Sequence, residues 1–253
     1  MLVTTDAVLL RAHPYSESSL VLRFLTQDLG VVRAMVRGVR RAGGKGVSPP
    51  ATFDRGGLEV SYRENRELQT LRSFAVEASG RRLGSHVLPF TGASLLAELV
   101  LAAPSEEPSA ELYGALAGAL DRLAEGKEGD GVVGEIFAGA WAILGALGYA
   151  PSVDDCVRCG EPLEDDAVAR FDASAGGLRC PACATEAAGG RVGPGARSEL
   201  RALLRSEAPA RLRKPSGHLR LLEAFALDHL ELSKPLSSAG MLRGLLTSSQ
   251  DVT

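Results

Sequence analysis

The stretch CVRCGEPLEDDAVARFDASAGGLRCPAC, residues 156–183, holds every cysteine of this 253-residue chain. Its spacing is C-x2-C-x20-C-x2-C, and two close pairs separated by about 15–20 residues are typical of a zinc site. Each pair holds two thiolates near one ion, and four thiolates complete a tetrahedral shell with no open position. We therefore predict one structural zinc ion per chain, bound by Cys156, Cys159, Cys180 and Cys183.

The residues between the two pairs predict how the pairs meet. Gly160 directly follows the first pair and permits a tight backbone turn beside the ion. Residues 168–180 (VARFDASAGGLRC) have the pattern of a hairpin that turns at residues 175–177. Such a hairpin would bring the second pair back beside the first, so we expect a zinc ribbon.

Other uses of the cysteines fit the sequence less well. Two disulfides are chemically possible, but nothing at the start of the chain resembles a secretory signal, and cytosolic thiols stay reduced. A thioredoxin-like redox pair would open a helix within a βαβ unit, and no such pattern surrounds either pair. Catalytic zinc would need a position for water and an adjacent HxE element, which this spacing does not offer.

Upstream of the cysteines, the first 80 residues predict strands. Residues 5–11 (TDAVLLR), 19–26 (SLVLRFLT) and 31–37 (VVRAMVR) are short, partly alternating apolar segments. We expect residues 13–16 (HPYS) to break the first pair of strands and residues 27–30 (QDLG) to form a tight turn.

Two further strands are predicted after a Gly- and Pro-rich segment, at residues 57–62 (GLEVSY) and 67–76 (ELQTLRSFAV). Five short antiparallel strands within about 75 residues fit a small closed barrel, and the OB-fold is the common barrel of this size that binds nucleic acid. Periodicity alone does not separate such a barrel from another five-stranded sheet.

Beyond residue 82 the apolar residues recur at helical spacing, as in amphipathic helices of a bundle. The charge-free run 136–153 has an apolar part too short to cross a membrane, so we read it as a buried helix. Helices are predicted over residues 94–103, 109–125, 132–147, 196–206, 217–232 and 238–246.

These elements predict an α+β protein with an N-terminal five-stranded OB-like barrel and a C-terminal helical bundle that carries an inserted zinc ribbon. The expected boundaries are residues 1–80 for the barrel, 81–150 and 191–250 for the bundle, and 151–190 for the ribbon. Nothing in the pattern predicts a membrane span, and we expect a cytoplasmic protein.

The net charge of −3 conceals an uneven distribution along the chain. Residues 1–82 hold 13 Lys and Arg against 8 Asp and Glu, and residues 191–220 hold 8 against 2, whereas residues 83–190 hold 5 against 17. Because screened fields act over about 10 Å, two basic segments can present a basic surface on an acidic protein. The average charge therefore does not exclude a nucleic-acid binder.

Two groups of basic residues are candidates for DNA contacts, with a solvated charged face as the alternative for both. The first runs from the third strand into the following loop without an acid between its members, where an OB-like barrel can line a phosphate groove. The second recurs at every fourth residue of a predicted helix, opposite Leu200, Leu203 and Leu204. The candidates are Arg33, Arg37, Arg40, Arg41 and Lys45 in the first group and Arg197, Arg201 and Arg205 in the second.

Signatures of catalysis are missing from the sequence. Lys45 lies in no phosphate-binding loop, because residue 39 is Val where the first glycine would stand. The chain contains neither a Gly-x-Ser-x-Gly elbow nor an HExxH element, and its four histidines are scattered. An enzyme is therefore the weaker hypothesis, and no catalytic residue is predicted.

Taken in order, these segments resemble the RecO family over nearly the whole chain. The opening TDAVLLRAHPYSESSLVLRFLTQDLGVVRAMVRGVRR is similar to the first barrel strands of that family. LGALGYAPSVDDCVRCG and RFDASAGGLRC are similar to its helix end, first cysteine pair and hairpin, and HLELSKPLSS to its C-terminal Pro-Leu-Lys-Ser element. Ser237 stands where that element usually has lysine. Some members lack the cysteines, which suggests that zinc stabilises the fold and is not the source of activity.

The resemblance implies a non-enzymatic mediator of recombinational DNA repair. Such proteins bind single- and double-stranded DNA, anneal complementary strands and, with RecR, help RecA to displace single-strand-binding protein. A nucleoid-associated cytoplasmic location follows from that role. The alternatives are a zinc-stapled protein-interaction adaptor that binds no nucleic acid and a zinc-ribbon transcription or replication accessory factor.

Overall fold

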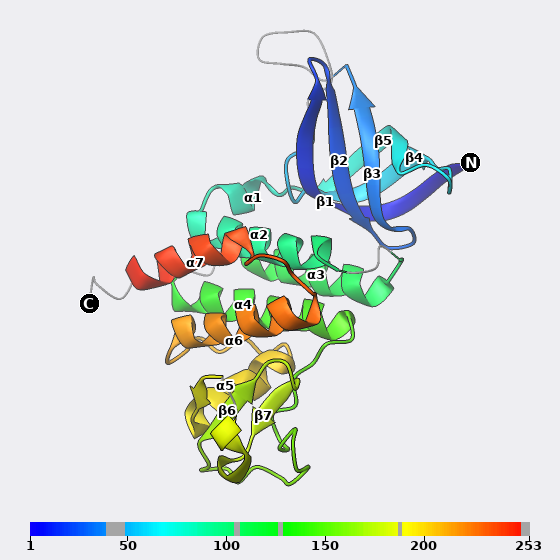
Figure 1. The fold of residues 1–253 in the computed structure, drawn as a ribbon. Helices are drawn as coiled ribbons and strands as arrows, with labels where there is room; N and C mark the ends of the chain where they lie inside the picture. The colour runs from blue at the N-terminus through cyan, green and yellow to red at the C-terminus, as the bar shows by residue number, and fades with distance from the viewer. Residues whose placement is uncertain (39–48, 104–106, 126–128, 187–188, 249–253) are drawn as a thin grey trace.

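The computed structural model describes residues 1–38, 49–103, 107–125, 129–186 and 189–248. A β-barrel forms one end of the molecule, a layer of helices lies in the middle, and a small ribbon domain forms the opposite end (Figure 1). The predicted α+β architecture is confirmed.

The barrel has five strands in the order β1-β2-β3-β5-β4, closed by β4 against β1. All neighbouring pairs are antiparallel except β3 and β5, which run parallel where the barrel closes. The strand pattern of the sequence therefore produces the predicted OB-like barrel. The strands are β1 (Leu2–Ser16), β2 (Ser19–Thr26), β3 (Gly30–Arg37), β4 (Arg55–Ser61) and β5 (Leu68–Ala78).

The break expected at residues 13–16 is wrong, because β1 continues to Ser16 and turns only at residues 17–18. Pro14 lies opposite Leu20, next to a register shift in the β1–β2 pair. The pairing of β1 with β4 ends at Val8, and in the described part of the chain no strand pairs with this edge of β1 beyond that point. A proline is tolerated there because its missing N–H interrupts no ladder on that side.

Alternation along β1 joins the barrel to the helices. Ala7 and Leu9 lie in the barrel interior, whereas Val8 and Leu10 belong to the large apolar core that extends into the bundle. Successive side chains point to opposite faces of a strand. Strand β1 therefore contributes apolar side chains to the barrel core and to the bundle core. Beside this contact, Arg55 donates to Asp121 Oδ1 at 2.7 Å and Oδ2 at 2.9 Å, and to the Ala117 carbonyl at 3.0 Å.

The bundle core is centred on α4, whose inward residues include the buried Phe137 and Trp141. This helix contains most of the charge-free run of the sequence, which is buried in protein as predicted. Within the described ranges, no helix is both long and apolar enough to cross a membrane. The helices are α1 (Arg81–Gly84), α2 (Val87–Leu101), α3 (Ala110–Ala124), α4 (Asp130–Ala146), α5 (Pro194–Leu204), α6 (Pro215–His229) and α7 (Ser237–Ser248).

The ribbon lies between α4 and α5 in the chain. Strands β6 (Ala169–Asp172) and β7 (Gly177–Arg179) form the predicted hairpin, and the 3-10 helix η1 (Pro181–Glu186) follows. Strand β8 (Arg191–Val192) pairs with the other edge of β6. The ribbon sheet therefore includes two residues beyond position 190, where the sequence placed the boundary.

Candidate metal centre and nucleic-acid interface

Two tight turns present the four cysteines to one another. In the first, the Gly160 N–H donates to the Cys156 carbonyl at 2.8 Å, and Gly160 has a φ of 75°. This left-handed conformation favours glycine, as the sequence suggested. In the second turn, the Cys183 N–H donates to the Cys180 carbonyl at 3.0 Å. The hairpin between the turns brings these two segments side by side.

The four sulfur atoms all lie within 4.8 Å of one another, in a geometry that can hold a metal ion. The Cys159 and Cys180 Sγ atoms are 3.9 Å apart. A tetrahedral ion with Zn–S bonds of about 2.3 Å would separate two sulfurs by about 3.8 Å. A disulfide would require about 2.05 Å, and all four cysteines are unbridged. The donor set therefore fits zinc and leaves no ligand position for water.

Hydrogen bonds prepare Cys156 to be the thiolate of this group. Burial by itself raises the pKa of its thiol, but backbone N–H groups of Cys180, Cys159 and Arg158 outweigh burial and lower the pKa to about 6. The Cys180 N–H lies 3.3 Å from the Cys156 sulfur. A side-chain hydrogen bond with Cys180 instead raises the pKa of Cys183 to about 12. Four thiols this close cannot all ionise until a cation offsets their charge.

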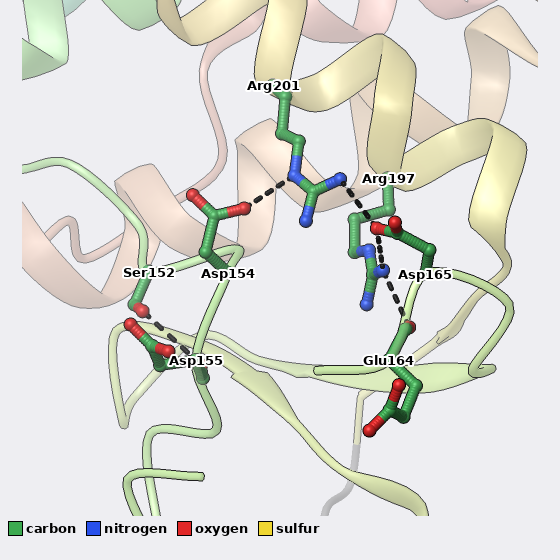
Figure 2. Close-up of polar contacts among 7 residues, drawn as sticks. All are labelled: Ser152, Asp154, Asp155, Glu164, Asp165, Arg197 and Arg201. Carbon is green, nitrogen blue, oxygen red and sulfur yellow. Dashed lines mark hydrogen bonds and ion pairs between the residues drawn. The ribbon is translucent and has the colours of Figure 1, made fainter. Parts of the chain in front are cut away.

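Helix α5 holds the ribbon through two of the three arginines that the sequence marked as DNA-binding candidates (Figure 2). The Arg197 side chain is only 1% exposed, and its Nη2 donates to the Glu164 carbonyl at 2.7 Å and to Asp165 at 3.4 Å. Arg201 Nε donates to Asp154 Oδ1 at 2.5 Å. The predicted stack of three guanidinium groups on one open helix face is therefore wrong at Arg197, which the ribbon covers.

The third of these arginines also has a local partner. Arg205 Nη2 lies 3.0 Å from Glu207 Oε2, and this hydrogen bond raises the pKa of Arg205. Ion pairs within the chain therefore account for part of the uneven charge distribution in this region. Part of the basic segment 191–220 pairs with the acidic segment that precedes it, and its positive charge is not all available to a ligand.

In the barrel, the described part of the basic run lies at the outer surface of β3. Arg33 is half-exposed and lies 3.7 Å from Glu67, and Arg37 is exposed at the end of the strand. The other three predicted residues, Arg40, Arg41 and Lys45, lie outside the described residues.

Strand register adds two arginines that the sequence analysis missed. Arg23 lies directly opposite Arg11 on one side and Arg33 on the other. Its neighbours Leu22 and Phe24 point into the barrel, so Arg23 is on the outer face with its two partners. Arg11, Arg23 and Arg33, which we call the arginine row, thus cross three strands at intervals of about 5 Å. Planar guanidinium groups in such a row can donate to successive phosphate oxygens.

Apolar side chains flank the arginine row. The next row on the same face is His13, Val21 and Met35, which lie opposite one another in register. Tyr15 follows near the tip of β1 and is 65% exposed. Phe53, the next aromatic residue after β3 in the described chain, is buried against Phe90 with ring centroids 5.6 Å apart. Tyr15 is therefore the better candidate for stacking on a base.

The histidines have separate structural surroundings. His218 Nε2 lies 2.9 Å from Glu199, and His229 Nε2 lies 3.0 Å from the Ala173 carbonyl. His13 is on the barrel and His86 precedes α2. In the described part of the chain, no second group of three or more His, Cys, Asp or Glu side chains is close enough to share a metal ion.

Comparisons with known proteins agree with this arrangement. Residues 1–79 match the family model described as "Recombination protein O N terminal", and residues 87–238 match "Recombination protein O C terminal". The chain is 33% identical over 241 residues to "DNA repair protein RecO" of Anaeromyxobacter sp. (strain K), with 90% of this chain and 91% of that protein covered. It is 29% identical over 251 residues to the protein of that name from Rubrobacter xylanophilus, with coverages of 94% and 98%.

Proposed function

Because this chain belongs to the RecO family of DNA repair proteins, we propose that it is a non-enzymatic, DNA-binding mediator of recombinational repair. In this role it binds single- and double-stranded DNA and anneals complementary strands. With RecR, it helps to load RecA onto DNA that single-strand-binding protein covers. Its place of action would be the nucleoid in the cytoplasm. The family relationship supports these partners and this location.

The observation that carries the proposal is the arginine row on the outer face of the barrel. Like charges that lie directly opposite one another on a sheet cost stability. Arg11, Arg23 and Arg33 meet in this way on three neighbouring strands. An anionic strand laid across the row would relieve the part of this repulsion that the Arg33–Glu67 ion pair leaves, and would gain charge-assisted hydrogen bonds. Tyr15, Val21 and Met35 beside the row offer surface for bases.

We also propose that the ion of the metal centre is zinc and that its role is structural. The four thiolates would hold it, and it would supply charge neutralisation and cross-linking of the two turns. No residue on the arginine row takes part in the metal centre, so DNA contact and metal binding are separate functions of the chain.

A salt titration of DNA binding tests the proposed function. Labelled single-stranded DNA should bind the purified protein, with a logarithmic salt dependence of about −0.7 per neutralised phosphate. Arg11→Ala combined with Arg23→Ala should weaken binding to all sequences and reduce that slope by about 1.4. The charge-matched control is Arg81→Ala with Arg211→Ala, two exposed residues outside the barrel. Absence of DNA binding by the wild-type protein would favour the adaptor alternative.

A further inference from the structure

A second candidate site lies where the ribbon meets helix α6. A cavity of about 530 Å³ opens between β6, β8, the start of α5 and one side of α6, within the size range of small-ligand pockets. We call it the ribbon cavity. Its apolar wall includes Val192, Ala196 and Leu221, and three cations, Arg191, Lys214 and Arg220, also line it.

These three cations differ from the other basic residues of their segment. Arg197, Arg201, Arg205, Arg211 and Arg213 each lie within 4 Å of a carboxylate. Over the described ranges, Arg191, Lys214 and Arg220 have no such partner, and all three are exposed. The basic residues of this segment that form no ion pair with a described residue therefore all line one cavity.

The acidic residues of the cavity do not neutralise these cations. Asp172 is engaged by Arg179 and Ser174 and by the Ala175 N–H, and these contacts lower the pKa of its carboxyl group despite its burial. Asp228 also lines the cavity and forms no ion pair with a cation in the described part of the chain, and its single carboxylate leaves the three cations in excess. The ribbon cavity thus combines an apolar wall with cations that have no ion-pair partner.

His218, another residue of the cavity lining, carries an unsatisfied polar atom. It is 2% exposed and lines the cavity, and its Nε2 lies 2.9 Å from Glu199. Its Nδ1 has no hydrogen-bond partner among the described residues. A buried polar atom without a partner costs free energy, which a ligand or a water molecule that bonds to it would recover.

We propose that the ribbon cavity binds a nucleotide of a single DNA strand, with phosphate oxygens on Arg191, Lys214 and Arg220 and the base against the apolar wall. The inference rests on the proposed function, because DNA is the anionic ligand that function provides. A nucleotide joins a charged group to a flat apolar one, as the cavity joins cations to an apolar wall. The site is distinct from the arginine row, because the barrel and the ribbon lie at opposite ends of the molecule (Figure 1).

Two separated sites predict a length dependence of binding. A strand that reaches both sites gains affinity, because the second contact becomes intramolecular. A short strand occupies one site at a time and gains nothing from the other. Removing the ribbon cavity should therefore affect long strands more than short ones.

The test compares two charge-matched double variants in fluorescence anisotropy with labelled oligothymidylates of roughly 6 and roughly 40 nucleotides. Arg191→Ala with Arg220→Ala should weaken binding of the long strand roughly tenfold and reduce its salt slope by about 1.4. Arg81→Ala with Arg211→Ala should stay within about twofold of wild type, since neither residue lines the cavity. Metal content and circular dichroism verify that each variant is folded.

Photo-crosslinking of the wild-type protein keeps the test independent of any substitution. A strand carrying 4-thiothymidine should crosslink to peptides containing residues 189–192 or 214–221, besides the barrel. Crosslinks confined to the barrel, with unchanged affinity in the cavity variant, would overturn the inference while leaving the proposed function intact. Protection of the cavity by an acidic peptide, without any effect of the cavity variant on DNA, would assign the cavity to a protein partner. Failure of the wild-type protein to bind either strand would instead reject the proposed function.

Discussion

Arg201 on α5 and Asp154, two residues before the first metal-site cysteine, form a hydrogen-bonded ion pair with an Nε–Oδ1 distance of 2.5 Å. Beside it, the buried Arg197 holds the Glu164 carbonyl. Both contacts join a helix that follows the ribbon in the chain to loops that precede the hairpin. The metal centre is therefore attached to the bundle through arginine side chains as well as through the backbone.

The two arginines should differ in their contribution to stability. Arg197→Met should lower the free energy of unfolding by about 2 kcal/mol, because a buried charge-assisted hydrogen bond is lost. Arg201→Ala should cost less than about 1 kcal/mol, because Asp154 is largely exposed to solvent. Urea denaturation of both variants measures the difference. Equal effects would show that burial of Arg197 has no energetic weight.

The two solvent-accessible arginines of this group, Arg201 and Arg205, should contribute little to DNA binding. Arg201→Ala with Arg205→Ala should leave the salt slope unchanged, because carboxylates already neutralise both guanidinium groups. Arg37→Ala should lower the slope for single-stranded DNA by about 0.7, the value of one phosphate contact. Adding Arg40→Ala to Arg37→Ala should increase that change. A lower salt slope for Arg201→Ala with Arg205→Ala, but not for the Arg37 variants, would place the DNA contact on α5.

Metal analysis should find close to one zinc ion per chain in freshly purified, reduced protein. Cys159→Ser or Cys180→Ser should lower the zinc content, because three thiolates leave the tetrahedral shell incomplete. Removal of the ion by a chelator should unfold the ribbon first, with the barrel retained. Limited proteolysis would then cut within residues 151–192 before it cuts the barrel. Protein that is fully folded and free of metal would contradict this expectation.

A double-mutant cycle on Arg55 and Asp121 should measure the attachment of the barrel to α3. The hydrogen bond to Asp121 raises the pKa of Arg55, and the two guanidinium–carboxylate contacts are parallel. Because Asp121 is more than half exposed, we expect a coupling energy of about 0.5–1 kcal/mol. Additive effects of Arg55→Ala and Asp121→Ala would mean that this ion pair adds nothing to the attachment of the barrel.

Strand annealing should proceed without ATP, and purified protein should neither hydrolyse ATP nor cleave or unwind DNA. The sequence contains no phosphate-binding loop, and the histidines lie in separate structural surroundings. Annealing of complementary labelled strands with and without ATP tests whether annealing needs nucleotide. Phosphate release measures ATP hydrolysis. An ATPase activity that a single point substitution in this protein abolishes would contradict these expectations.

The cysteine site and most of the helices were predictable because short-range spacing determines them, but α1 was missed and α2 begins at Val87, seven residues before the predicted start. The Cys-x2-Cys pairs and Gly160 define their turns locally, and apolar residues at helical spacing mark α4 and α6 whatever they pack against. Strand β1 was harder, since a proline usually interrupts a sheet, and Pro14 is accepted where, among the described residues, no strand pairs with its far edge.

The burial of Arg197 and the arginine row were beyond sequence reasoning. Helical spacing identifies residues on one face, but it does not show that Glu164 and Asp165, more than 30 residues earlier, cover that face. Arg11, Arg23 and Arg33 look unrelated in the sequence, and only strand register places them side by side. Counting cross-strand partners in the predicted hairpins could have found the Arg23–Arg33 pair.

The packing of α7 against α2 has a consequence for synthesis on the ribosome. Helix α7 contacts α2, and the Ser238 N–H donates to Glu98 across 140 residues of chain. The five barrel strands are complete once residue 78 has been made, so the barrel can close early. Helices α3 and α4 cover part of α2 once residue 146 has been made, but the side of α2 that α7 contacts stays uncovered until residues 237–248 emerge. At about 5–20 residues per second, that interval lasts for many seconds, during which this face is open to chaperones and to other nascent chains.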